Sequence, residues 1–106
     1  MTSISEEVLS YFQKYADEFG KLLIPRNDDE KIANSLGLHF KKFYSIDLLE
    51  LCIKEYISKC YEPVVVYNFA MEAHKIREHL EEGLKDKEEI ARLMKETKEF
   101  MRNYES

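Results

Sequence analysis

Glycine, proline and cysteine are scarce in this sequence, and tryptophan is absent. Its 106 residues include three glycines, two prolines and two cysteines. So little turn-forming material excludes most all-β folds, which need many tight turns. Apolar residues nevertheless make up 44% of the chain and aromatic residues 12%, enough to build a core. The length suits one domain, so the composition predicts a single all-α domain over residues 1–106.

The two cysteines and the start of the chain bear on the cellular compartment. Cys52 and Cys60 fall in one predicted helix, so their Cα atoms should lie about 12 Å apart, beyond the roughly 7 Å that a disulfide allows. The chain is polar from Met1 to Glu7, and no apolar run reaches the length of a signal peptide or a transmembrane helix. We therefore expect an intracellular protein, cytoplasmic or nuclear, that does not bind membranes.

Apolar residues recur at the spacing of amphipathic helices, beginning near the N-terminus. Ser3 followed by Glu6 forms a capping box, which predicts a first helix over 4–24 that ends before Pro25. The apolar face of this helix consists of Val8, Phe12, Tyr15, Phe19 and Leu22. Together with the segments that follow, it predicts a bundle of about five helices.

Capping signals mark the second and third helices. Acidic residues favour a helix over 28–36, and Gly37 suits the left-handed position that follows a helix. The next residues, 38–44, fit either a loop or a helical turn. Ser45 can cap a third helix over 46–60, whose wide apolar stripe is typical of a central helix.

Two further helices are predicted, over 63–82 and 87–104. Pro63 suits a helix start, and although the valine-rich run 64–67 has strand propensity, no partner strand is evident, so we predict helix. Gly83 predicts a break between the two helices. The apolar heptad positions stay in register across that break, however, so one continuous helix is the alternative.

No group of residues forms a catalytic or metal-binding motif. His74 and His79 are five residues apart, about 500° around a helix, so they do not share a face. The paired acids are explained by capping, and a thiol on the apolar stripe, such as Cys52 or Cys60, is normally unreactive. We therefore predict no catalytic residue, metal or cofactor. An enzyme would need one of these histidines beside a thiol or a carboxylate in the fold.

One region is both basic and aromatic, within a chain whose net charge is −5. Residues 39–44 read His-Phe-Lys-Lys-Phe-Tyr, and aromatic rings can stack on exposed bases while lysines contact phosphates. The lysines of this region are Lys41, Lys42, Lys54 and Lys59. The alternative is that Phe40 and Phe43 pack against the core while the lysines face solvent. The acidic balance of the chain opposes a large nucleic-acid footprint.

The segment 87–104 is amphipathic without being basic. Helices that bind membrane surfaces favour a basic polar face, so this one should pack on its own domain, whose body we expect over 4–80, or on a partner. Its apolar face consists of Ile90, Leu93, Met94, Phe100, Met101 and Tyr104. The leading hypothesis is a non-enzymatic module for protein–protein interaction or self-association through this face.

Three short features also resemble a known family. They are EFGKLLIP at 18–25, YSIDLL at 44–49, and Tyr67 at the distance expected for a tyrosine helix. Over about residues 12–74 the chain thus resembles the C-terminal helical module of DnaD-like primosome proteins, which are replication-initiation factors. It departs from them at Met71, where an aliphatic residue is typical, and it lacks their closing tryptophan. The resemblance implies a helicase-loading scaffold that contacts DNA near Tyr67.

Overall fold

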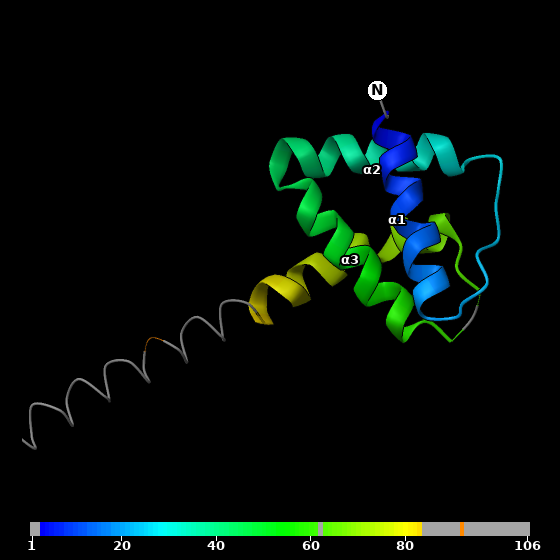
Figure 1. Ribbon diagram of the computed structural model, residues 1–106. Helices are drawn as coiled ribbons and strands as arrows, with labels where there is room; N and C mark the ends of the chain where they lie inside the picture. The colour runs from blue at the N-terminus through cyan, green and yellow to red at the C-terminus, as the bar shows by residue number, and fades with distance from the viewer. Residues whose placement is uncertain (1–2, 62, 84–91, 93–106) are drawn as a thin grey trace, which may run out of the picture.

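The computed structural model describes residues 3–61, 63–83 and 92 of the chain. Its helices are α1 (Ile4–Glu18), α2 (Asp29–Phe43), α3 (Ile46–Lys59) and a fourth helical segment over 66–83. Figure 1 shows α3 running back from the end of α2 at an angle, with α1 crossing in front of α2 and packed against α3 as well. The predicted all-α class is confirmed. None of the helices in the described part of the chain is long and apolar enough to cross a membrane.

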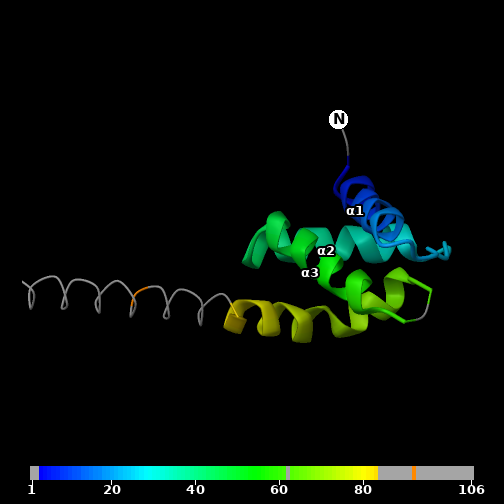
Figure 2. The ribbon, with the colours of Figure 1, turned by 60° about the horizontal axis from the view of Figure 1, so that its bottom comes forward.

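α1 and the segment 66–83 lie on opposite sides of the pair formed by α2 and α3. Figure 2 shows α1 above that pair and 66–83 below it. The two outer helices meet in the angle between α2 and α3, where the rings of Phe12 and Phe69 pack edge to face at 5.3 Å. The ring of Tyr56 on α3 also packs against Phe69, at 5.5 Å. Phe69, which is fully buried, therefore ties the fourth helical segment to the rest of the body.

α1 ends earlier than the predicted helix over 4–24. Its last helical residue is Glu18, and Gly20 follows with φ +66°, a left-handed conformation that glycine adopts readily. The stripe therefore stops early, since Val8, Phe12 and Tyr15 are buried whereas Leu22 is 68% exposed. The predicted end at Pro25 was wrong because the glycine terminates the helix first.

After α1 the chain is extended and pairs with the residue that follows Pro63. The Val64 amide donates to the Leu22 carbonyl at 2.7 Å, and the Ile24 amide donates to the Val64 carbonyl at 2.9 Å. These bonds form an isolated parallel bridge between Leu23 and Val64. The fourth helical segment therefore begins at residue 66 and not at 63 as predicted. The strand propensity of the valine run is realised at Val64, because its partner lies in the segment that was expected to be helical.

α2 is longer than the predicted helix over 28–36. It continues to Phe43 and includes both Gly37 and most of the stretch 38–44 that was left open between loop and helical turn. Gly37 is buried inside this helix, where a Cβ atom would overlap Ile4 Cγ2 and lie 3.1 Å from Val8 Cγ2. The glycine therefore allows α1 to cross close to α2. It does not end the helix.

The serine caps are confirmed. Ser3 Oγ accepts a hydrogen bond from the Glu6 amide at 3.2 Å, and Ser45 Oγ accepts one from the Leu48 amide at 3.1 Å. α3 spans the predicted residues to within one position. The predicted helix over 87–104, and with it the question of a break after Gly83, lies outside the described residues.

A candidate binding groove between α2 and residues 66–83

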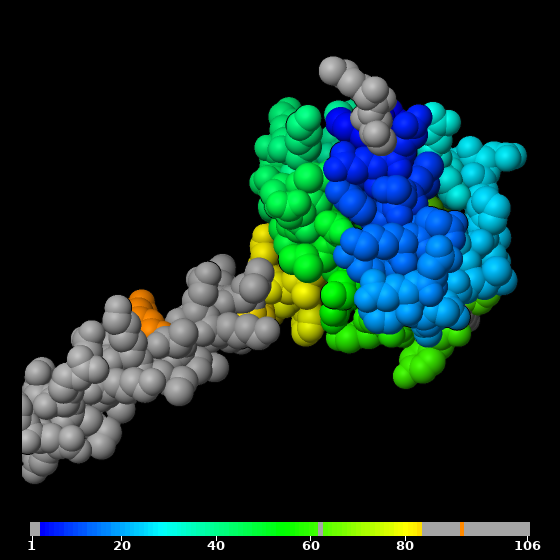
Figure 3. Space-filling view, in the orientation of Figure 1, coloured from blue at the N-terminus to red at the C-terminus, as the bar shows by residue number. Residues whose placement is uncertain are grey.

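α2 carries a second apolar stripe beside the face that it buries in the core. The stripe consists of Ile32, Leu36, His39 and Phe43, at steps of four, three and four residues, which places them along one side of the helix. Ile32 and Leu36 are partly buried, whereas Phe43 is 59% exposed. Figure 3 shows α1 in front of α2, whereas the stripe borders a hollow that Ala70 of the segment 66–83 also lines, so it lies on the side of α2 toward that segment.

The segment 66–83 lies opposite this stripe. Ala70 and His74 line hollows on the α2 side of this segment. Helical spacing places Tyr67 and Met71 beside them, toward solvent, as flanking residues that do not themselves line the hollows. Tyr67 is 49% exposed and Met71 is 64% exposed. The α2 stripe therefore borders a gap whose opposite side is formed by Ala70 and His74, with the exposed Tyr67 and Met71 flanking it.

Two adjoining hollows occupy this gap. One of about 490 Å³ is lined by Ile32, Leu36 and His39 of α2 and by Ala70 opposite. The other, of about 240 Å³, shares Leu36, His39 and Ala70 with the first and extends toward Tyr44. We call this continuous feature the α2 groove, bounded by residues 31–44 of α2 and its C-cap and by residues 67–77 opposite.

The charged residues that line the α2 groove are all basic. Lys31 lines one end and Arg77 the other, with His39 and His74 between them, and no lining residue of either hollow is a carboxylate. Lys42 is eleven residues after Lys31, which is about three helical turns, so it extends the same edge of α2. Both lysines are exposed.

Arg77 closes one end of the groove. Its guanidinium lies over the Tyr44 ring at 4.3 Å, and Nη1 donates to Glu81 Oε2 at 2.9 Å. A longer ion pair joins it to Glu78 at 3.8 Å. The side chain is only 14% exposed. Arg77 is thus compensated within the protein, whereas the two lysines on the α2 edge face solvent.

A third hollow lies on the other side of the segment 66–83, against α3. It measures about 440 Å³, and its charged residues alternate in sign: Glu55, Lys59, Glu72 and Lys75. Lys59 forms an ion pair with Glu55 one turn away. We call this feature the α3 groove. His79 lines it, whereas His74 lines the α2 groove, so the prediction that these histidines do not share a face is confirmed.

The thiols and the other metal-ligating residues show no reactive arrangement. Cys52 is fully buried in α3, and burial raises its pKa to about 11, which favours the unreactive thiol. Neither Cys52 nor Cys60 forms a disulfide. Within residues 3–61 and 63–83, no three histidine, cysteine, aspartate or glutamate side chains come together as metal ligands could.

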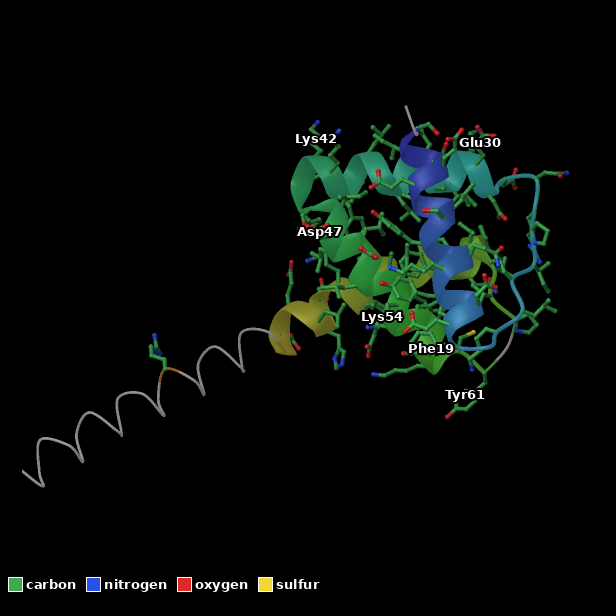
Figure 4. All side chains as sticks on the ribbon, in the orientation of Figure 1. Phe19, Glu30, Lys42, Asp47, Lys54 and Tyr61 are labelled. Carbon is green, nitrogen blue, oxygen red and sulfur yellow. The ribbon has the colours of Figure 1, made fainter. Side chains whose placement is uncertain are left out.

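The residues predicted to bind nucleic acid do not gather in one place. Lys41 and Lys42 lie at the end of α2, whereas Lys54 and Lys59 lie on α3, as Figure 4 shows for Lys42 and Lys54. Lys54 lies 5.9 Å from the centre of the Tyr15 ring. Tyr67 lies at the start of the fourth helical segment, where it flanks the α2 groove. The six residues predicted to bind a partner, at positions 90–104, fall outside the described residues.

The two phenylalanines of the basic and aromatic region have different environments. Phe40 is buried at 2% exposure, as the packing alternative expected, but Phe43 is mostly exposed. Lys42 Nζ lies 5.3 Å from the centre of the Phe43 ring. Since α2 continues to Phe43, this ring extends the apolar stripe of the α2 groove.

Comparisons of the chain with protein family models, curated proteins and solved structures found no match. The resemblance to DnaD-like proteins therefore stays a prediction.

Proposed function

We propose that this chain is a non-enzymatic module for protein–protein interaction and that its partner binds in the α2 groove. The apolar floor of the groove, formed by Ile32, Leu36 and Ala70, supports this proposal, and Phe43 leaves a large apolar surface open further along the same side of α2. Burying such surface stabilises a complex by roughly 25 cal/mol per Å². Aromatic side chains and methionine are also enriched where proteins bind each other. The predicted apolar face of 87–104 would add a second contact to this module.

Site-specific photo-crosslinking in the native cells tests the proposal. A photoreactive benzoylphenylalanine placed at Tyr67 or at Met71 should give adducts of the same discrete mass. The control position is Leu51, because its 49% exposure matches that of Tyr67 while it lies on α3 and belongs to neither helix that bounds the α2 groove. Circular dichroism of each variant establishes that it has folded.

Adducts at the two groove positions but not at position 51 would support the interaction module. Their absence at both groove positions, in folded variants, would refute it. The same adducts at position 51 would also refute it, since they would reflect collisions with abundant proteins and not a specific surface.

DNA binding is the second candidate function, and the exposed end of α2 favours it. The Phe43 ring is open to stacking, with Lys42 beside it and Lys41 next in sequence. Single-stranded DNA is bound by such combinations of aromatic rings and lysines. This function would agree with the replication role that the DnaD-like resemblance implies.

A titration with single- and double-stranded DNA at two salt concentrations tests this alternative. Binding that weakens with salt, and weakens again in the Lys41→Glu/Lys42→Glu variant, would support it. A double variant with the same charge change elsewhere, Arg26→Glu/Lys75→Glu, is the control. No binding even at low salt would remove DNA from consideration.

A further inference from the structure

We infer that the α2 groove selects an acidic amphipathic helix as its occupant, an inference that rests on the proposed function. The first reason is shape. The groove runs between two helices, and its α2 wall extends over residues 32–43, about 16 Å at 1.5 Å per residue. A third helix of about three turns fits this length. Apolar side chains at positions i, i+4, i+7 and i+11 of that helix would contact Ile32, Leu36 and Phe43 on one wall and Ala70 opposite.

The second reason is charge. The chain carries a net charge of −5, yet the lining of this groove includes no carboxylate. Lys31 and Lys42 stand on the same edge of α2, about three turns apart, and both are exposed. A helix seated in the groove would place its flanking residues against this edge. Carboxylates at those positions would be attracted, and lysines would be repelled.

A nucleic acid fits the same surface less well. Polyanions gain affinity from clusters of lysine and arginine, whereas Arg77 is already paired with Glu81 and only two lysines line the edge. The floor of the groove is formed by aliphatic residues, Ile32, Leu36 and Ala70, which suit leucine-like side chains better than bases.

A second copy of the chain also fits less well. The helices α1, α2 and α3 each bury their main apolar face in their own core, so none of these three is free to serve as the occupant. The predicted helix over 87–104 carries lysines and arginines as well as glutamates beside its apolar face, so it matches a basic edge less well than an acidic helix does. A helix from another protein, apolar on one face and acidic on its flanks, satisfies both the shape and the charge of the groove.

The test uses three synthetic peptides and the full chain labelled with ¹⁵N. Each peptide is about 15 residues long and has leucine at the four apolar positions. The three differ only in their flanking residues, which are glutamate, glutamine or lysine. Nuclear magnetic resonance titrations at low salt report both affinity and location. We expect the glutamate peptide to bind on the order of 10-fold more tightly than the lysine peptide, with shifts at residues 32–43 and 67–74.

Two pairs of positions provide the matched variants. Lys31→Glu should remove the preference for the acidic peptide, whereas Lys75→Glu, on the α3 side of the segment 66–83, should leave it unchanged. Ala70→Glu, at a residue that lines both hollows, should weaken binding of all three peptides. Leu51→Glu, which introduces the same charge at a surface outside both grooves, should not.

Several results would overturn this inference. They are equal or stronger binding of the lysine peptide, shifts outside the groove, or no binding by any peptide. A DNA oligonucleotide that shifts the same residues more strongly would assign the groove to nucleic acid. A dimer in sedimentation that Ala70→Glu dissociates would assign it to a second copy. If crosslinks at Tyr67 persist in any of these cases, the interaction module stands and only its acidic specificity fails.

Discussion

The two sides of the segment 66–83 offer grooves of different chemistry. The α3 groove has glutamates and lysines in alternation, and Glu55 and Lys59 pair with each other. The α2 groove has cations and histidines along its lining and no carboxylate. Charges that compensate one another within the chain leave little to attract a partner. The difference teaches that the pattern of uncompensated charge, and not the hollow itself, marks a surface that discriminates between partners.

The largest effect should come from removing the residue on which both grooves depend. Phe69→Ala deletes a fully buried ring that packs on Phe12 and Tyr56, so we expect it to lower the free energy of unfolding by about 3–5 kcal/mol. Tyr67→Ala, two residues away but half-exposed, should cost less than about 1 kcal/mol. Urea unfolding followed by circular dichroism measures both. Equal costs would show that Phe69 does not anchor this segment.

A smaller loss of stability, with structural changes confined to the α2 side, should follow a substitution where α1 crosses α2. Gly37→Ala places a methyl group against Ile4 and Val8, and such overpacking typically costs about 1–3 kcal/mol. Gly83→Ala is the matched control, because a Cβ atom there meets nothing within 4 Å and alanine favours helix. Amide chemical shifts should change along α2 and its groove while those of the α3 groove stay in place. A stabilised Gly37→Ala would contradict the close crossing.

The glycines also show what could be predicted from the sequence. Local hydrogen bonds could be predicted, since Ser3 and Ser45 cap their helices as expected. Gly37 was expected to end a helix, but it lies inside one, whereas Gly20 ends α1 before the expected stop at Pro25. A glycine satisfies both roles equally well. Only the helix that packs against it decides which role it takes, and a linear sequence does not show that packing.

The candidate site was hidden for the same reason. The spacing of Ile32, Leu36, His39 and Phe43 was visible in the sequence, but a predicted helix end at Gly37 divided this stripe in two. The Leu23–Val64 bridge was missed because both partners were assigned to helices. What did carry over is the all-α class, the bounds of α3 and the separation of His74 from His79. These depend on periodicity within one helix, which the sequence displays directly.

The ion pairs beside the two grooves, Arg77–Glu81 and Lys59–Glu55, should differ in how much they stabilise the fold. Arg77→Ala removes a partly buried guanidinium that contacts both Glu81 and the Tyr44 ring, and we expect a cost of about 1–2 kcal/mol. Lys59→Ala removes only an exposed pair with Glu55, which should contribute less than about 0.5 kcal/mol. Both values come from urea unfolding at low salt. If Lys59→Ala lowered the free energy of unfolding more than Arg77→Ala, the ion pair beside the α3 groove would be the more stabilising of the two.

The smallest effect concerns the thiol of α3 and depends on pH. Burial raises the pKa of Cys52 from 9.0 to about 11, so the unfolded state loses its thiol proton before the folded state does. The resulting stabilisation is fully present below pH 9 and is lost as the pH rises through 11. By pH 9.5 we expect a loss of roughly 1 kcal/mol or less. Unfolding measured in reductant from pH 8 to 9.5 should show this slope in the native chain. Cys52→Ala should flatten it, and an unchanged slope would mean that another group, such as Tyr11 with its pKa raised to about 12, governs alkaline stability.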